Sequence, residues 1–285
     1  MKTALITGVT SGIGHASTFE LAKIGYDTLV LIARNSEKLL GVKAELLAKY
    51  PKLTIILKVC DLADFDQVKM TALELKSELK ESGIDLFLNN AGIGQFKRTE
   101  NKQGFENNLA TNYLSQVILT EILLEKLNPN ANVIFVSSMA YRGANFDYDD
   151  INLERSFSMF KAYGNSKALQ MVYSRQLQKR FENNEKSIHF EAIHPGVVRT
   201  SWGRSDANGF LKLLFKLGNI FMISSEYSAS HNVLAPIYEL NKASVGKSDI
   251  WMDGKPKIVG SSFMKKENSD KLWKFTKKSL SKWME

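Results

Sequence analysis

Short apolar runs rich in leucine and β-branched residues alternate along the chain with longer stretches whose apolar positions recur at helical spacing. This alternation is typical of a parallel sheet with crossover helices, and the near-continuous apolarity of the short runs predicts strands buried on both faces. The predicted strands are Thr3–Thr7, Thr28–Ala33, Leu53–Cys60, Ile84–Asn89, Asn132–Ser137 and Ser187–His194. The predicted helices cover residues 13–24, 36–49, 65–82, 102–127 and 163–183. We therefore expect an α/β fold with a doubly wound parallel sheet, the Rossmann fold.

The length and the continuity of these elements point to one domain. The chain has 285 residues, which is within the range that a single hydrophobic core can serve. It contains no linker-like segment, internal repeat or low-complexity stretch. We interpret the irregular residues 141–161 as an active-site loop rather than a domain boundary. The expected domain covers residues 1–285.

Composition excludes several classes of protein. With 44% hydrophobic and 24% charged residues, the chain can bury enough apolar surface to fold, which excludes collagen-like and largely disordered proteins. Its single cysteine, Cys60, cannot form an internal disulfide, and its four histidines have no metal-ligand spacing, so no metal site is predicted. The N-terminus lacks the apolar length of a signal peptide, and no uninterrupted apolar run approaches the roughly 18 residues that span a bilayer. A cytoplasmic protein is expected.

The basic excess is concentrated near the C-terminus. The net charge is +8, and residues 261–285 contain seven lysines against three acidic residues. Within this segment Trp273, Thr276, Leu280 and Trp283 recur at helical spacing, which predicts an amphipathic helix. Two interpretations stay open: the helix docks on the core, or it makes a weak contact with a membrane surface or a partner. The sequence has no zinc-finger, basic-zipper or RNA-binding motif, so we expect no nucleic-acid partner.

A glycine-rich segment joins the first predicted strand to the first predicted helix. It reads Thr7-Gly8-Val9-Thr10-Ser11-Gly12-Ile13-Gly14. Glycines at such a turn let backbone amides approach a pyrophosphate at a helix N-terminus. The spacing Gly-x-x-x-Gly-x-Gly departs from the commoner dinucleotide fingerprint, so a plain glycine-rich turn is the alternative. The candidate phosphate-binding residues are Gly8, Thr10, Ser11, Gly12, Ile13 and Gly14.

The end of the second predicted strand indicates which dinucleotide is bound. In NAD-binding proteins an acidic residue at this point binds the ribose 2′-hydroxyl, but here the chain reads Leu31-Ile32-Ala33-Arg34-Asn35. Arg34, with Asn35 beside it, can form charge-assisted hydrogen bonds to a 2′-phosphate. We therefore predict NADP (NADPH) rather than NAD. The alternative is an exposed arginine that caps a helix.

A tyrosine and a lysine lie four residues apart in Tyr163-Gly164-Asn165-Ser166-Lys167, so on a helix they share a face. A phenol has an ordinary pKa near ~10, and a neighbouring cation lowers it toward the working range of an acid or base. The spacing alone is weak evidence, because Tyr238-Glu239-Leu240-Asn241-Lys242 repeats it. Tyr163 differs because it follows Ser138 by 25 residues and precedes the run His194-Pro195-Gly196.

In order and spacing these motifs resemble the short-chain dehydrogenase/reductases in their NADP-preferring form. The resemblance covers residues 1 to about 204 and adds Asp61-Leu62, Asn89-Asn90-Ala91-Gly92, Asn112, Ser137-Ser138 and Pro195-Gly196-Val197-Val198-Arg199-Thr200 to the motifs above. It implies that Tyr163 is the acid/base, that Lys167 holds the nicotinamide ribose and lowers the tyrosine pKa, and that Ser138 binds the substrate oxygen. Asn112 would anchor a water that relays protons. Cofactor contacts are implied for Asp61, Leu62, Asn90, Ala91, Gly92, Tyr163, Lys167, Pro195, Gly196, Val198 and Thr200.

Several details look most like retinol-dehydrogenase-like reductases: the long interval from Ser138 to Tyr163, the Ala33-Arg34 pair, the run from His194 to Thr200, and the ending Leu272-Trp273. This resemblance implies a lipophilic carbonyl or alcohol substrate. Ten of the 14 residues from Phe210 to Ile223 are apolar, so we expect a substrate lid over residues 201–225. Core packing and contact with a membrane surface are the alternatives.

The sequence thus predicts an NADP(H)-dependent oxidoreductase that transfers hydride between the nicotinamide and a small-molecule carbonyl or alcohol. Many proteins of the resembling family pair through two helices that correspond to residues 102–127 and 163–183, which implies a homo-oligomer, a dimer or tetramer. Two rival functions are a non-catalytic NADP-binding regulator and a peripheral membrane protein. The intact set of Asn112, Ser138, Tyr163 and Lys167 favours the enzyme.

Overall fold

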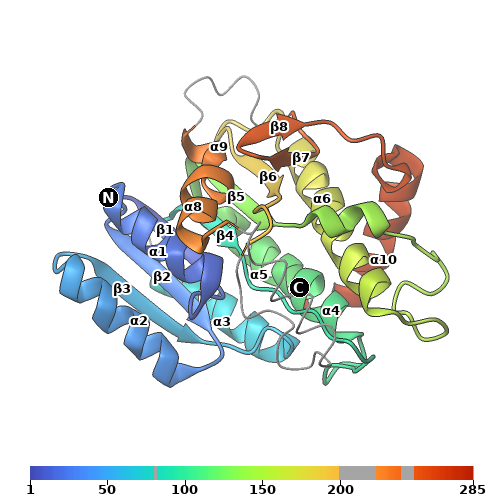
Figure 1. The fold of residues 1–285 in the computed structure, drawn as a ribbon, viewed down its shortest axis with the longest axis horizontal. Helices are drawn as coiled ribbons and strands as arrows, with labels where there is room; N and C mark the ends of the chain where they lie inside the picture. Colours follow the sequence, from blue (N-terminus) through green and yellow to red (C-terminus); the bar gives the residue numbers. More distant parts are fainter. Residues whose placement is uncertain (80–81, 199–222, 239–246, 285) are drawn as a thin grey trace.

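The computed structural model of the chain describes residues 1–79, 82–198, 223–238 and 247–284 (Figure 1). An eight-stranded sheet runs through the molecule in the order β3-β2-β1-β4-β5-β6-β7-β8. Strands β1 to β7 are parallel, and β8 pairs antiparallel with β7. The strands are β1 (Thr3–Thr7), β2 (Thr28–Ala33), β3 (Thr54–Val59), β4 (Ile84–Asn89), β5 (Leu127–Val136), β6 (His189–Ile193), β7 (Ile250–Met252) and β8 (Lys255–Lys257).

Helices cover both faces of this sheet, and the strand order reverses between β1 and β4. On one face lie α1 (Gly12–Lys23) and α2 (Ser36–Lys49), and on the other lie α3 (Phe65–Glu78), α5 (Ser115–Leu123) and α6 (Met159–Arg180). Because successive strand residues point to opposite faces, Leu5 joins one core while Ala4 and Ile6 join the other. The predicted doubly wound Rossmann fold with a single domain is confirmed.

Shorter elements connect these layers. They are α4 (Asn107–Leu109), the π-helical turn η1 (Ala110–Leu114), the 3₁₀ turns η2 (Leu124–Lys126), η3 (Met139–Gly143) and η7 (Ser262–Met264), α8 (Ser225–Tyr227), the π-helical η5 (Ser228–Val233) and α9 (Ala235–Tyr238). The last helix is α10 (Lys266–Met284). None of the helices in the described ranges is both long and apolar enough to cross a membrane.

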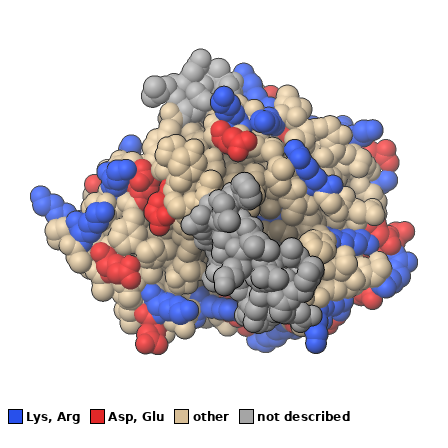
Figure 2. Space-filling view, in the orientation of Figure 1, with Lys and Arg blue, Asp and Glu red and all other residues tan. Residues whose placement is uncertain are grey.

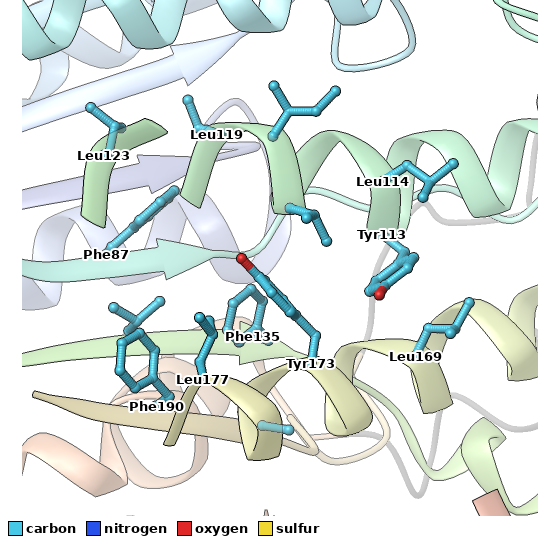
Figure 3. Packing of buried hydrophobic residues seen from close by; sticks show 14 of the residues in the cluster. Phe87, Tyr113, Leu114, Leu119, Leu123, Phe135, Leu169, Tyr173, Leu177 and Phe190 are labelled. Atoms are coloured by element: carbon cyan, nitrogen blue, oxygen red, sulfur yellow. The ribbon is translucent and has the colours of Figure 1, made fainter. Parts of the chain in front are cut away.

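Aromatic side chains fill the core between the sheet and the pair α5 and α6 (Figure 3). The Tyr173 ring of α6 meets Phe135 of β5 edge-on at a centroid distance of 5.4 Å, and Tyr113 of η1 at 6.2 Å. The Tyr173 hydroxyl donates to Glu121 on α5 at 2.8 Å, which satisfies its polar end. This packing fixes α5 and α6 against each other, and the two helices carry the site described below.

The C-terminal helix α10 packs against α3, α5 and α6. Its side chains Leu272, Thr276 and Leu280 are buried, and the Thr276 hydroxyl is 2.8 Å from the Tyr113 hydroxyl. The Trp273 ring stacks on Tyr173, while Trp283 meets Phe65 edge-on. The apolar face that the sequence pattern predicts is therefore the face that docks on the core, and the lysines lie on the outer side.

The structure also departs from the predicted elements. Strands β7 and β8 were not predicted because each has only three residues and Lys255–Lys257 has no apolar pattern. Strand β5 begins at Leu127, five residues before the predicted start, and α6 begins at Met159, four residues before. The predicted helix over 102–127 is α4, η1, α5 and η2 in succession. Thr200 and most of the predicted lid lie outside the described residues.

Acidic and basic side chains are interspersed over the face of the molecule in Figure 2. The described residues on this face form no continuous basic stripe of the kind that follows a nucleic-acid backbone.

Candidate functional site

The predicted site residues gather at one edge of the sheet, where the parallel strands end. The glycine-rich segment follows β1, Arg34 and Asn35 follow β2, and Asn90 to Gly92 follow β4. In α/β sheets of this kind ligands bind outside the carboxyl ends of the strands, where the strand order reverses. Five further predicted cofactor residues follow β3 and β6: Asp61, Leu62, Pro195, Gly196 and Val198. The remaining two that the structure describes, Tyr163 and Lys167, lie on α6.

The turn after β1 is shaped by close contacts that only glycine permits. Gly8 has a φ of +72°, and its amide donates to the Ile32 carbonyl at 2.9 Å. A Cβ at Gly14 would lie 2.3 Å from the Gly8 carbonyl oxygen and 2.4 Å from the Asn90 amide nitrogen. That same nitrogen donates to the carbonyls of Thr7 and Gly8 at 2.9 and 3.2 Å. The segment is therefore a tight cradle locked to β4 through Asn90.

The helix that starts in this cradle leaves its first amides available. Ser11 is the N-cap of α1, but its side chain makes no capping hydrogen bond, and the first turn has no acidic residue. By contrast, Asn35 caps α2 and Asp64 caps α3 through their side chains. The first amides of a helix have no partner within the helix, and the helix dipole favours negative charge there. The N-terminus of α1 is thus suited to an anionic group such as a pyrophosphate.

Arg34 and Asn35 differ in how they are engaged. The Asn35 side-chain oxygen accepts from the Lys38 amide at 2.8 Å, so it serves the start of α2. Arg34 is exposed and makes no ion pair with any other described residue. Its guanidinium is available to a ligand at the edge of the cradle.

Asn112 is held in place on η1 by three side-chain hydrogen bonds. Its amide oxygen accepts from the Ile93 amide at 2.7 Å, and its amide nitrogen donates to the Ile93 carbonyl at 2.9 Å and to the Ser166 hydroxyl at 3.0 Å. The asparagine therefore ties the segment after β4 to α6. Its side chain is completely buried.

Ser138 and Tyr163 form a hydrogen-bonded pair. Ser138 follows β5 and its hydroxyl accepts from the Ala140 amide at 3.2 Å. Burial raises the pKa of the Tyr163 phenol to about 12, and the hydrogen bond from Ser138 acts in the opposite direction. The Lys167 amine lies 5.5 Å from the centroid of the tyrosine ring. The expected lowering of the tyrosine pKa by Lys167 is not found, because burial raises this pKa and the contribution that lowers it comes from Ser138.

Lys167 is buried, with 3% of its surface exposed. Its amine donates to the Val136 carbonyl at 2.8 Å and to the Gln170 side-chain oxygen at 3.3 Å. Burial lowers the pKa of this amine to about 7. A Cβ at Gly92 would lie 3.3 Å from the amine, so the lysine faces the segment predicted to line the cofactor cleft.

His194 is a positioning residue that the sequence analysis did not assign to the site. Its Nδ1 accepts from the Met139 amide at 3.3 Å and so supports the turn that follows Ser138. Burial lowers the pKa of the imidazole to about 4, which keeps it neutral and able to accept that bond. The available signal was its place directly before Pro195-Gly196.

Gln116 and Gln170 were also missed. Both are buried, at 1% and 0% exposure, and they link α5 to α6 through a hydrogen bond of 2.7 Å. The available signal was spacing: Gln116 is four residues after Asn112, and Gln170 is three after Lys167, which puts each on the helix face of its neighbour. Tyr238 lies on α9, outside this group, and its hydroxyl donates to Glu20 at 3.2 Å.

Comparison with known proteins gives the family. A sequence model of the family described as short chain dehydrogenase matches residues 2–209. The chain belongs to this family. The predicted resemblance to retinol-dehydrogenase-like members is confirmed by relatives of that name.

Retinol dehydrogenase 14 of Mus musculus is 32% identical over 214 residues, which cover 71% of this short-chain dehydrogenase and 63% of the relative. Retinol dehydrogenase 13 of Homo sapiens is 30% identical over 206 residues, 71% of this chain and 61% of that one. The match thus spans less than two thirds of each of these relatives. An NADPH-bound carbonyl reductase from chicken fatty liver shares the fold, with a TM-score of 0.66, 20% identity, and coverage of 92% of this chain and 99% of that one.

Proposed function

We propose that this short-chain dehydrogenase uses NADP(H) to transfer hydride between the nicotinamide and a carbonyl or alcohol carbon. One observation carries the proposal: a hydrogen-bonded Ser138 and Tyr163 pair lies beside the buried Lys167. This group stands at the same sheet edge as the glycine cradle, so a dinucleotide held by the cradle would reach it.

The residues present fit a dinucleotide with a 2′-phosphate. The cradle from Gly8 to Gly14 and the uncapped amides of α1 would hold the pyrophosphate. Arg34 would bind the 2′-phosphate, since it is exposed and the segment has no carboxylate in the place that NAD requires. The family resemblance assigns the adenine to Asp61 and Leu62 and the nicotinamide to the segment from Pro195. The NADPH in the chicken reductase is consistent with this choice.

A bound NADPH would supply the hydride. Tyr163 would donate the proton to the carbonyl oxygen, and its raised pKa keeps the phenol protonated throughout the neutral range. Ser138 would donate a hydrogen bond to the same oxygen, and Lys167 would bind the ribose. Asn112 would hold the water that returns a proton to the site. The protonated phenol is the form that carbonyl reduction requires.

The exposed apolar side chains near this group favour a lipophilic substrate. Phe160 is one helical turn before Tyr163 and is 77% exposed, and Val197 follows Pro195 by two residues and is 60% exposed. Large apolar side chains exposed beside a polar site are typical of a binding surface for an apolar ligand. The lid over residues 201–225 remains a prediction from sequence.

The remaining expectations about partners are still predictions. Pairing of two chains through α5 and α6 would compete with α10, which packs on both helices. A membrane contact would use the outer lysines of α10 rather than its tryptophans, because the tryptophan rings pack on Tyr173 and Phe65. The cytoplasmic location is likewise a prediction.

The test of the proposed function is NADPH consumption, followed by the loss of reduced-nicotinamide absorbance, with aldehydes and ketones of rising chain length. We expect turnover that improves with chain length and is poorer with NADH. Tight NADPH binding without turnover of any compound would instead favour the non-catalytic regulator. Failure to bind NADPH would contradict the proposed cofactor.

A further inference from the structure

Two buried glutamines stand behind the lysine of the site, between α5 and α6. The Gln170 amide nitrogen donates to the Gln116 side-chain oxygen at 2.7 Å and to the Asn112 carbonyl at 2.9 Å. The Gln116 amide nitrogen in turn donates to the Ala91 carbonyl at 2.9 Å. Figure 3 shows buried hydrophobic side chains that pack between the same two helices.

These partners leave only one orientation for the Gln170 amide. Its nitrogen faces two oxygen atoms, and neither the Asn112 carbonyl nor the Gln116 side-chain oxygen can donate a hydrogen bond. Reversal of the amide would set oxygen against oxygen at both contacts. The Gln170 oxygen is therefore directed at the Lys167 amine, 3.3 Å away.

The lysine depends on neutral acceptors of this kind. Its other acceptor is the Val136 carbonyl at 2.8 Å, and within the described part of the chain no carboxylate contributes to its pKa. Among the described residues, the titratable group recorded beside the amine is Tyr163. A buried ammonium is stable only when acceptors replace the water that it has lost. Amides joined in a chain polarise one another, which strengthens the acceptor at the end of the chain.

We propose that Gln170, oriented by Gln116, is a positioning residue that keeps Lys167 charged and directed at the reaction site. The same amide ties the lysine to the backbone of Asn112, and Gln116 ties it to the segment after β4. Lysine, asparagine and the segment that lines the cofactor cleft therefore form one hydrogen-bonded unit. The role of this unit in catalysis rests on the proposed function, whereas its effect on the charge and position of Lys167 can be tested without it.

The test is the titration of Lys167 in the cofactor-free protein. The ¹³Cε resonance of labelled lysine is followed against pH, and Lys167→Arg identifies the signal. In the unchanged protein we expect a midpoint near 7. In Gln170→Met, which keeps the side-chain length but loses the acceptor, we expect the midpoint to fall by about one to two pH units, since a hydrogen bond to a charged group favours that form.

Two further variants make the test specific. Gln116→Met removes the group that orients Gln170 and should lower the midpoint by a smaller amount, even if Gln170→Met fails to fold. Ser174→Ala is the matched control, because Ser174 is buried one turn further along α6 and its hydroxyl donates to the Met171 carbonyl without touching the lysine. We expect its midpoint to equal that of the unchanged protein.

Unchanged midpoints in folded Gln170→Met and Gln116→Met, or an equal fall in Ser174→Ala, would overturn the proposal. The result does not depend on turnover. If no carbonyl compound is reduced, the proposed function fails while the titration still decides the role of Gln170. With a working substrate, the alkaline limb of kcat against pH should move with the midpoint, because the reaction requires the charged lysine.

Discussion

Replacing Gly14 with alanine adds a single methyl group at the tightest contact of the predicted phosphate site. The new Cβ would lie 2.3 Å from the Gly8 carbonyl oxygen and 2.4 Å from the Asn90 amide nitrogen. The Gly8 oxygen belongs to the backbone, and the Asn90 nitrogen donates hydrogen bonds to the carbonyls of Thr7 and Gly8, so neither atom can move alone. Relief of the contact requires the cradle to open by about 1 Å, since non-bonded carbon contacts are favourable only near ~3.5 Å.

The expected cost follows from overpacking. Extra methyl groups in well-packed sites cost about 1–3 kcal/mol of folding free energy. Displaced amides would also lose charge-assisted hydrogen bonds to the pyrophosphate, at about 1.5–3 kcal/mol each. One such loss weakens NADPH binding by at least about tenfold. Gly41→Ala is the matched control, because Gly41 lies within α2 with nothing within 4 Å of its added Cβ. It should gain about 0.5–1 kcal/mol of stability through helix propensity.

The assay combines urea denaturation with a fluorescence titration of NADPH for both variants. We expect Gly14→Ala to be less stable than the unchanged protein and to bind NADPH at least tenfold more weakly. Gly41→Ala should be slightly more stable and bind NADPH normally. Normal stability and NADPH affinity in Gly14→Ala would refute the assignment of this turn as the phosphate cradle.

Three further predictions test other parts of the account. Arg34→Ala should raise the KM for NADPH severalfold or more and leave the KM for NADH nearly unchanged, because only NADPH carries the 2′-phosphate. An equal rise in both KM values would contradict the assignment of Arg34 to the 2′-phosphate. Lys167→Met should be more stable than the unchanged protein below pH 7, and this advantage should shrink as pH rises from about 7 toward 10.5. In the folded protein the pKa of Lys167 lies below its ordinary value, so between pH 7 and 10.5 the unfolded chain binds a proton that the folded protein does not, and the unchanged protein gains stability as pH rises. A stability advantage of Lys167→Met that grows with pH would contradict this reasoning. Leu280→Ala removes a fully buried side chain of α10 and should cost about 2–5 kcal/mol in denaturant unfolding, whereas Leu40→Ala, at a side chain that is 60% exposed, should cost far less; equal costs would argue against docking of α10.

The central strands could be predicted from sequence because parallel strands buried on both faces are continuous apolar runs. Three of them, Thr3–Thr7, Thr28–Ala33 and Ile84–Asn89, have the predicted bounds. The edge strand β8 could not be predicted in the same way, since Lys255–Lys257 is partly exposed and polar. The π-helical turn at Ala110–Leu114 could not be predicted either, because an apolar pattern does not distinguish a single π-helical turn from the α-helix that continues it.

Some residues of the site could also be predicted from sequence and others could not. Gly8 and Gly14 could be predicted because the backbone geometry at these positions excludes other residues. Gln116 and Gln170 could not be predicted from their residue type, because glutamine in a helix is usually a surface residue. Only the tertiary pairing of α5 with α6 shows that the two amides meet. The raised pKa of Tyr163 likewise reflects burial, which the spacing from Lys167 does not reveal.

The most direct measurement compares two tyrosines that share the same spacing to a lysine in the sequence. Tyr163→Phe and Tyr238→Phe are assayed for NADPH-dependent reduction of the best carbonyl substrate, and NADPH affinity is measured for both. The account predicts a fall in kcat of about 100-fold or more for Tyr163→Phe with folding retained, since it loses the general acid. Tyr238→Phe should keep kcat near that of the unchanged protein. Retention of kcat in Tyr163→Phe, or an equal loss in Tyr238→Phe, would contradict the assignment of Tyr163 as the proton donor.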